Sequence, residues 1–385
     1  MKRRERPVLA RPMTYRPAAL ILSVLIALVT GCEREEEPVK VGFAGVLTGR
    51  LSDLGRSGRN GVILAVEEVN RRGGINGRPV ELIVKDDKQD PEEALRADRE
   101  LIDEGVVAII GHVTSAMSMA AVPLMNKEKV LMISPTTSTD RLKGIDDYFV
   151  RVMPPNRAET DNLAHHGFNK MGLKRLSAVY DLSNRAYTER YFNNFREEFE
   201  GLGGKVIHTE TFTSGKDVDF SRLAELLLKP GPDGILVAAG AIDTAMICQR
   251  LRVGGSKVSI ISSGWAMTSD LLHEGGPAVE GVVFSQLFDR QSRHRRYLEF
   301  KKRFEERFGE PPDFAAAHGY EAASALFKAL SENPDPGKLK DTLLKQDLFE
   351  GVQGDFKIDK YGDPQRPRFL ITVKNGRFLA EKRTP

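Results

Sequence analysis

Residues 39–85, VKVGFAGVLTGRLSDLGRSGRNGVILAVEEVNRRGGINGRPVELIVK, contain a strand, a helix and a second strand in succession. The segments Val39–Ala44 and Val80–Lys85 are rich in Val and Ile and mostly continuous in apolar character, as strands buried on both faces are. Between them, Asn60–Arg71 has the apolar spacing of a helix, and Gly73-Gly74 directly after it is typical of a helix C-cap. The stretch therefore predicts a β-α-β unit, from which parallel sheets covered by helices are built.

Short apolar runs and amphipathic segments keep alternating along the chain, in two series separated by Pro154-Pro155. The further strands expected are Val106–Ile110, Val130–Ile133, Leu176–Tyr180, Val206–Phe212, Ile235–Ala239, Val258–Ile261, Val282–Gln286, Phe356–Ile358 and Phe369–Lys374. The further helices expected are Pro91–Glu104, Ser115–Asn126, Thr188–Glu200, Phe220–Leu228, Asp243–Arg252, Arg295–Phe308, Ala315–Leu330 and Lys338–Lys345. Two such series predict two similar lobes, and the segment after Val282 is expected to return and complete the first lobe.

The N-terminus has the pattern of an export signal that ends in a lipobox. Several basic residues precede the apolar stretch Ala18–Val29, which leads into Val29-Thr30-Gly31-Cys32. The stretch is too short to span a membrane, which needs roughly 20 residues. We therefore expect residues 1–31 to be a lipoprotein signal peptide, Cys32 to be diacylated, and residues 32–38 to be the polar tether of a membrane-anchored protein. The alternatives are an ordinary cleaved signal and an N-terminal core helix.

Composition and charge narrow the class of protein. The formal net charge is +3, but residues 1–31 hold six Lys or Arg and one acid, so the mature chain carries −2. That balance gives no electrostatic reason to expect nucleic acid as a partner. With 41% hydrophobic and 29% charged residues over 385 positions, the chain has a globular composition, and two domains are expected. Besides Cys32 there is only Cys248, which we interpret as a small buried side chain.

Polar residues follow two of the expected strands. In open α/β sheets, ligands bind beyond the carboxyl ends of the strands. The segment Gly111–Ser115 follows one strand and opens a helix, where backbone N–H groups and hydroxyls suit a carboxylate. A plain N-cap role for Ser115 explains this pattern equally well. The segment Ser134–Asp140 follows the next strand and is rich in hydroxyls and carbonyls, which accept hydrogen bonds from an ammonium or amide.

A series of short motifs covers nearly all of the mature chain. They are Lys40-Val41-Gly42, Leu47-Thr48-Gly49, Asn60-Gly61, Ala65–Asn70, Gly73–Arg78, Asp86-Asp87, Asp90-Pro91, Ile133-Ser134-Pro135, Asp217–Phe220, Gly264-Trp265 and Glu280-Gly281-Val282. In this order and spacing they resemble the Leu/Ile/Val-binding family of type I periplasmic binding proteins. Members of that family are extracytoplasmic receptors of branched-chain amino-acid ABC transporters.

The resemblance implies an α/β fold of two Rossmann-like lobes with parallel central sheets, joined by three hinge crossovers. The crossovers are expected near Met153–Pro155, Phe284–Gln286 and Gln365–Arg368. The first lobe then comprises residues 39–153 and 285–365, and the second comprises residues 154–284 and 366–385. The ligand is expected to bind between the lobes at the hinge.

The resemblance also implies roles for individual residues. Hydroxyl and backbone N–H groups at Ser115, with Thr114 beside it, are expected to hold the ligand's α-carboxylate. A carbonyl and a hydroxyl at Thr137 and Ser138 are expected to meet its ammonium. Across the cleft, Tyr187, at the end of a loop that starts at Asp181, is expected to close over the ligand.

Two positions depart from the family's amino-acid binders. Ser263 stands where an acid usually precedes the glycine, and a buried ammonium without a partner is costly. Asp243 is the nearest replacement, and the N-cap of its helix is its alternative role. Leu54 stands where an aromatic wall residue is common, which leaves a broader aliphatic surface. Trp265, the only tryptophan, either walls in the ligand or belongs to the core.

These features predict a solute-binding receptor and not an enzyme. The glycines near residue 45 do not form a nucleotide-binding turn, and the histidines are scattered, so neither a cofactor nor a metal is predicted. We expect a branched-chain or other aliphatic amino acid as ligand and an ABC transporter permease as partner, on the periplasmic or other extracytoplasmic face of a membrane. Short amides, urea-like compounds or organic acids are the alternative ligands. Ligand sensing for a separate signalling receptor is the alternative role.

Overall fold

The first sheet has five parallel strands in the order β2-β1-β3-β4-β5. The structure is a computed structural model, and it describes residues 1, 5, 37–346 and 348–381. The strands of this sheet are β1 (Val39–Gly45), β2 (Val80–Asp86), β3 (Ala108–Ile110), β4 (Leu131–Ser134) and β5 (Phe149–Arg151). Because the winding reverses between β1 and β3, a crevice is expected beyond the carboxyl ends of these two strands.

Helices from two distant parts of the chain cover this sheet. The helices that connect its strands are α2 (Ser52–Arg71), α3 (Pro91–Asp103) and α4 (Ser115–Glu128). Later in the chain come α10 (Arg295–Phe308), α11 (Phe314–Glu332) and α12 (Leu339–Leu344), and α11 packs along α2. The two helices approach so closely that a Cβ atom added at Gly61 would lie 2.0 Å from the carbonyl oxygen of Ala316. Glycine is therefore required at this helix crossing.

The second sheet repeats the same winding and adds a hairpin. Its order is β14-β13-β10-β9-β8-β6-β7, in which the five strands from β6 to β10 are parallel, β13 is antiparallel to β10, and β14 is antiparallel to β13. These strands are β6 (Arg175–Asp181), β7 (Lys205–Phe212), β8 (Gly234–Ala238), β9 (Ser259–Ser262), β10 (Val283–Gln286), β13 (Phe369–Lys374) and β14 (Arg377–Ala380). The reversal between β6 and β8 gives this sheet a matching crevice.

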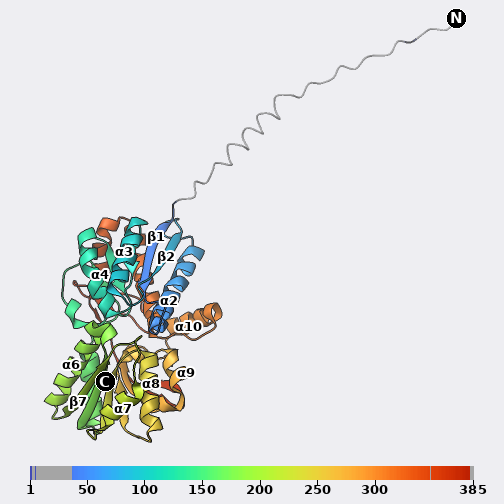
Figure 1. The fold of residues 1–385 in the computed structure, drawn as a ribbon. Helices are drawn as coiled ribbons and strands as arrows, with labels where there is room; N and C mark the ends of the chain where they lie inside the picture. The colour runs from blue at the N-terminus through green and yellow to red at the C-terminus, as the bar shows by residue number, and fades with distance from the viewer. Residues whose placement is uncertain (2–4, 6–36, 347, 382–385) are drawn as a thin grey trace. The chain divides into compact units, whose positions relative to one another are not determined.

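The second lobe has its own helices, of which Figure 1 labels α6, α7, α8 and α9 in the same half of the molecule as β7. They are α5 (Arg157–Asn169), α6 (Arg185–Gly201), α7 (Phe220–Leu228), α8 (Ala241–Val253) and α9 (Ser269–Gly275). The remaining elements are the pair β11 (Lys357–Ile358) and β12 (Pro364–Gln365) and the short helices η1 (Asp140–Leu142), η2 (Leu182–Asn184), η3 (Gly264–Ala266), η4 (Gly276–Val279) and η5 (Pro336–Lys338). The chain passes between the lobes after β5, after β10 and before β13.

This architecture confirms the predicted α/β class and the two lobes with parallel central sheets. The expected boundaries of the lobes stay a prediction. Besides the short helices η1 to η5, five elements were missed, namely β5, β12, β14, α5 and α9, and α2 begins at Ser52 and not at Asn60. The glycines in the first half of α2 suggest a loop, but here they let the helix approach its neighbours, as Gly55 does at the Val46 carbonyl.

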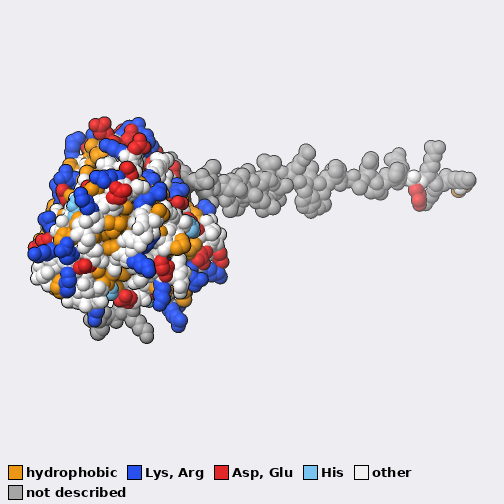
Figure 2. All heavy atoms as spheres, turned by 60° about the horizontal axis from the view of Figure 1, so that its bottom comes forward, with side chains coloured by type: hydrophobic (Ala, Val, Ile, Leu, Met, Phe, Trp, Pro, Cys, Tyr) orange, Lys and Arg blue, Asp and Glu red, His pale blue; other side chains and the backbone are white. Residues whose placement is uncertain are grey.

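The surface of the molecule carries charged side chains of both signs (Figure 2). In Figure 2, Lys and Arg side chains alternate with Asp and Glu over the face shown, so charge of one sign is not concentrated there. Among the described residues, no helix combines the length and apolar character needed to cross a membrane. The expected signal peptide, the lipidation site Cys32 and most of the tether lie outside the described residues.

Candidate functional site

A small cavity lies between the lobes, where the two crevices meet, and about 20 Å³ of it is open to the centre of a water-sized probe. From the first lobe it is lined by Leu54, Val113, Ser115, Thr136, Ser138 and Phe314. From the second lobe and the crossovers it is lined by Met153, Glu159, Asn184, Tyr187, Trp265 and Gln286. The predicted residues Leu54, Ser115, Ser138, Tyr187 and Trp265 are thus brought together.

Ser115 is the first residue of α4, and its side chain organises the loop opposite. Its Oγ accepts hydrogen bonds from the backbone N–H groups of Ser138 and Thr139, each at 3.3 Å. The N-cap residue is Thr114, so Ser115 is not a plain N-cap. Across the cleft, Asn184 Oδ1 accepts a hydrogen bond from the N–H of Ala116 at 3.0 Å. The N-terminal end of the α4 dipole, which favours anions, therefore lies at the cavity.

Of the residues predicted for the site, three lie outside the cavity lining. The hydroxyl of Thr114 donates to Gln89 Oε1 at 3.0 Å. The hydroxyl of Thr137 is 2.7 Å from Ser118 Oγ, behind the loop. Both threonines support the cavity wall, and their contacts with a ligand stay a prediction.

Asp243 is the third of these residues. Its Oδ1 is 2.5 Å from Arg50 Nε, so it forms an ion pair between the lobes. The N-cap of α8 is Gly240, which also excludes the alternative role. A ligand contact of Asp243 stays a prediction, and its pairing with Arg50 was not visible in the sequence because the two residues lie far apart in the chain.

Tyr187 and Trp265 form an aromatic corner of the cavity. Their ring centroids are 6.0 Å apart with an interplanar angle of 88°, and Tyr191 packs behind Tyr187 at 5.4 Å. Tyr187 lies in the first turn of α6, because the segment expected as a loop folds into η2 and the start of the helix. Burial raises the pKa of the Tyr187 hydroxyl well above its usual value, and Ser263 shares a hydrogen bond with it. The phenol therefore stays neutral at physiological pH.

Glu159, in the first turn of α5, is a site residue that the sequence did not reveal. It is fully buried, lines the cavity, and accepts a hydrogen bond from the N–H of Gly264 at 3.0 Å. Its other carboxylate oxygen lies 3.4 Å from Arg368 Nη1. Burial raises the pKa of Glu159, although Arg368 and the Gly264 N–H oppose the shift. No local pattern marks this residue, because the helix that carries it was itself missed.

Gly264 ties this acid to the aromatic wall. Gln286, at the second passage between the lobes, donates from its Nε2 to the Gly264 carbonyl at 3.2 Å. A Cβ atom at Gly264 would lie 2.8 Å from that nitrogen and 3.1 Å from a Glu159 oxygen. The position of Trp265, the next residue, is therefore set by groups from two of the three passages.

A family model described as periplasmic binding protein matches residues 38–377. The chain belongs to this family. A Leu-, Ile-, Val-, Thr- and Ala-binding protein from Pseudomonas aeruginosa is 23% identical, over 93% of this chain and 95% of the relative. The structure of a leucine-binding protein from Thermotoga maritima has a TM-score of 0.82 at 29% identity and covers 89% of this chain and 98% of its own.

A third comparison extends the range of ligands found on this fold. A solute-binding protein of an ABC transporter from Rhodopseudomonas palustris, in complex with benzoate, has a TM-score of 0.79 at 22% identity and covers 89% of this chain and 95% of its own. The predicted family is thus confirmed. Its members are solute-binding proteins, and the family name implies an extracytoplasmic location.

Two further polar contacts join the lobes of this periplasmic binding protein at the edge of the cavity. One is the Arg50–Asp243 ion pair, in which Arg50 also lies over the Phe220 ring, 5.5 Å from its centroid. In the other, the hydroxyl of Thr268 lies 2.6 Å from Asp53 Oδ2. Burial raises the pKa of Asp53 to about 6, opposed by Thr268 and assisted by nearby Asp270 and Asp313. Both contacts hold the N-terminal end of α2 and the loop before it against the second lobe.

The Asp53 contact predicts a pH dependence. An acid with a raised pKa binds its proton more tightly in the folded protein, so its ionisation lowers stability as pH rises from about 4 to about 6. We expect Asp53→Asn, which keeps a polar partner for Thr268, to raise the melting temperature at about pH 7.5 but not at about pH 4. Thermal unfolding across this range tests the expectation, and exposed Asp103→Asn is the control. Equal shifts at both pH values would contradict it.

Proposed function

We propose that this binding protein captures a small aliphatic amino acid between its lobes and delivers it to an ABC transporter permease. The observation that carries the proposal is the chemistry of the cavity. It offers hydrogen-bond donors and a helix N-terminus on one lobe and a buried carboxylate on the other. A free amino acid has charged groups that match both.

The carboxylate of the ligand suits the first lobe. The dipole of α4 favours an anion at its N-terminus, and the hydroxyls of Ser115 and Ser138 line the cavity beside it. The ammonium suits Glu159, which replaces the acid missing at Ser263. Since Arg368 already balances the charge of Glu159, a zwitterion adds no net charge to the buried cluster, and this limits the cost of burial.

The aliphatic side chain of the ligand suits the apolar part of the lining. That part consists of Leu54, Val113, Met153, Phe314 and Trp265. Burying a Leu or Ile side chain against such a surface contributes roughly 1.5–3 kcal/mol. The proteins from Pseudomonas and Thermotoga, whose names give branched-chain ligands, support the same ligand class.

An organic acid is the second candidate ligand. The ion pair with Arg368 leaves Glu159 less available to an ammonium, and Tyr187 and Trp265 offer aromatic surfaces. The benzoate-binding protein shows that the fold accommodates such a ligand. The amino acid remains the first candidate, because a lone carboxylate leaves one buried negative charge without a partner.

A thermal-shift screen of residues 33–385 against amino acids, amides and small organic acids separates these candidates. A ligand at about 100 times its dissociation constant stabilises the protein by about 2.7 kcal/mol. Stabilisation by aliphatic amino acids alone supports the proposal. Stabilisation by aromatic acids alone supports an organic acid as the ligand in place of the amino acid. If neither class of compound stabilises the protein, both candidate ligands are contradicted.

Ser115→Ala is expected to weaken ligand binding roughly tenfold or more, because a hydrogen bond to a charged group contributes about 1.5–3 kcal/mol. It also leaves the N–H groups of Ser138 and Thr139 without their acceptor. Isothermal titration calorimetry measures the loss. Ser177→Ala is the matched control, since that buried hydroxyl donates to the Leu227 carbonyl at 2.7 Å, away from the cavity. Equal affinities in the two variants would remove Ser115 from the site.

The lipid anchor is also part of the proposal. The lipobox that ends at Cys32 supports diacylation of that cysteine and retention of the mature chain at the membrane. Mass spectrometry of the N-terminal peptide from membrane-purified protein tests this. An unmodified Cys32, or a mature chain that begins elsewhere, would contradict it.

A further inference from the structure

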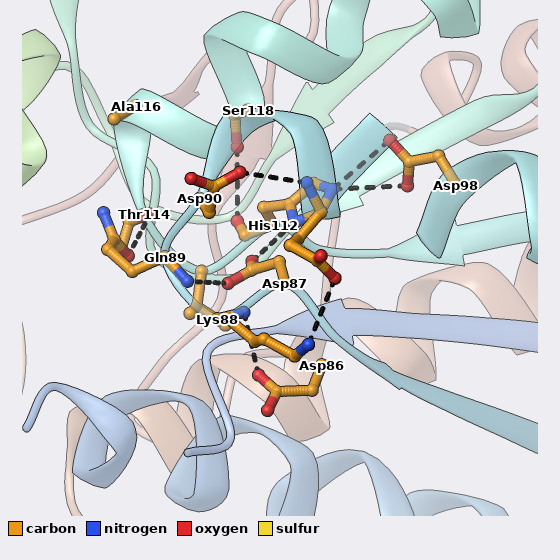
Figure 3. Close-up of polar contacts among 12 residues, drawn as sticks. Asp86, Asp87, Lys88, Gln89, Asp90, Asp98, His112, Thr114, Ala116 and Ser118 are labelled. Atoms are coloured by element: carbon orange, nitrogen blue, oxygen red, sulfur yellow. Dashed lines mark hydrogen bonds and ion pairs between the residues drawn. The ribbon is translucent and has the colours of Figure 1, made fainter. Parts of the chain in front are cut away.

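The side chain of His112 is completely buried between two aspartates. Its Nδ1 lies 2.7 Å from Asp87 Oδ2, and its Nε2 lies 3.2 and 3.3 Å from the two carboxylate oxygens of Asp98. Asp87 follows β2 and Asp98 lies on α3, so the ring joins three segments of the first lobe (Figure 3). All three side chains are fully buried. Removal of one of them would leave buried polar groups unpaired.

The ring is charged at physiological pH. Burial alone lowers the pKa of an imidazole, but here Asp98 and Asp87 outweigh burial and raise the pKa of His112 to about 10. An imidazolium donates from both nitrogens, which matches two carboxylate acceptors. Charge-assisted hydrogen bonds of this kind are stronger than neutral ones. The cluster is therefore a rigid connection within the lobe.

The backbone of His112 fixes the loop that leads to the cavity. Its carbonyl oxygen accepts hydrogen bonds from Ser134 Oγ at 2.6 Å and from the Ser118 and Thr137 hydroxyls at 3.3 Å each. Val113 and Ser115, directly after it, line the cavity. The position of these two residues thus depends on a histidine that does not itself line the cavity.

The Asp87 side of the cluster fixes a second loop, which contacts the other lobe. Asp87 Oδ1 accepts a hydrogen bond from the N–H of Gln89 at 2.9 Å, and Gln89 adopts a left-handed conformation with φ of 58°. The side chain of Gln89 accepts from Thr114 and donates to the Ser183 carbonyl of the second lobe at 3.2 Å. Ser183 belongs to η2, directly before the helix that carries Tyr187.

We infer that His112 is a positioning residue for ligand capture, because its ring holds in register the loop that carries Ser115 and the loop that carries Gln89 onto the second lobe. The inference rests on the proposed function for the site that these loops form. It assigns to the Asp87–His112–Asp98 cluster a role in affinity and in contact between the lobes, in addition to any role in stability.

His112→Gln and the milder Asp98→Asn test the inference in the mature protein. We expect both to weaken binding of the amino acid found in the thermal-shift screen by about tenfold or more. Without ligand, we expect hydrogen exchange to accelerate in residues 86–90 and 111–118, and also in residues 182–187 of the second lobe. Leu101→Ala, on the core face of the same helix α3, is the matched control that lowers stability without changing either loop.

The readouts separate the possible failures. A lower melting temperature with an affinity within twofold of the wild type, as expected for Leu101→Ala, would reduce the cluster to a structural role and overturn the inference. Unchanged exchange in residues 182–187 would overturn it whichever ligand binds. If the wild type binds no member of the panel, the proposed function fails, and the exchange measurement still decides whether His112 positions the two loops.

Discussion

Arg368→Leu is expected to lower the free energy of unfolding by about 3–5 kcal/mol, because it leaves Glu159 as a buried charge without its cationic partner. The exposed fractions of the two side chains are 7% for Arg368 and 1% for Glu159. Arg368 also donates to the Pro155 carbonyl at 3.1 Å, at the first passage between the lobes. Chemical denaturation, with the slope held common between variants, measures the loss.

The double variant Glu159→Leu/Arg368→Leu is the control for this prediction. Replacing both members of a buried ion pair by apolar side chains is often close to neutral, so most of the lost stability is expected to return. The double variant is also expected to lose ligand binding, since the acid proposed for the ammonium is gone. A single variant within about 1 kcal/mol of the wild type would show that solvent already compensates Glu159.

Trp265→Ala is expected to abolish measurable ligand binding and to cost about 3–5 kcal/mol of stability, the usual range for a buried aromatic residue. Only 7% of the Trp265 side chain is exposed, and its ring meets Tyr187 edge to face. The variant removes one wall of the cavity and leaves space that water can enter. Calorimetry with the ligand, together with thermal unfolding, gives the two losses separately.

Phe304→Ala on α10 separates the two effects of the tryptophan. Phe304 is also buried, with 1% of its surface exposed, but it lies outside the cavity lining. We expect it to lose a similar amount of stability and to keep its affinity for the ligand. If Trp265→Ala binds ligand as tightly as Phe304→Ala does, Trp265 is a core residue, which was its alternative role from the sequence.

The fold was largely predictable because its signals are local. Strands such as Val39–Gly45 and Leu131–Ser134 are continuous apolar runs, and the bounds of α7 and α10 follow from helical periodicity alone. The errors occurred where tertiary contact overrides propensity. The start of α2 is rich in glycine, which lowers its intrinsic helix propensity. The helix forms there nevertheless, because its glycines allow close packing against the Val46 carbonyl and against α11.

The site was only partly predictable, because its charges are paired across long separations in the chain. The resemblance placed Ser115, Ser138 and Tyr187 at the cavity, and each of them lies in a segment that follows a parallel strand. It could not reveal that Asp243 pairs with Arg50, or that Glu159 provides the buried acid. Partners of this kind are set by how the lobes and passages meet, and no spacing within one segment records them.

The hairpin of β13 and β14 bears on how the molecule forms. These strands complete the second sheet beside β10, while α11 reaches back to cover α2. The core of each lobe is therefore complete only when residues from the C-terminal part of the chain have packed onto it. Contacts between distant residues slow folding, because loop closure must precede the gain from packing. A chain with this connectivity cannot complete the core of either lobe until the residues of α11 and of the β13–β14 hairpin have been made.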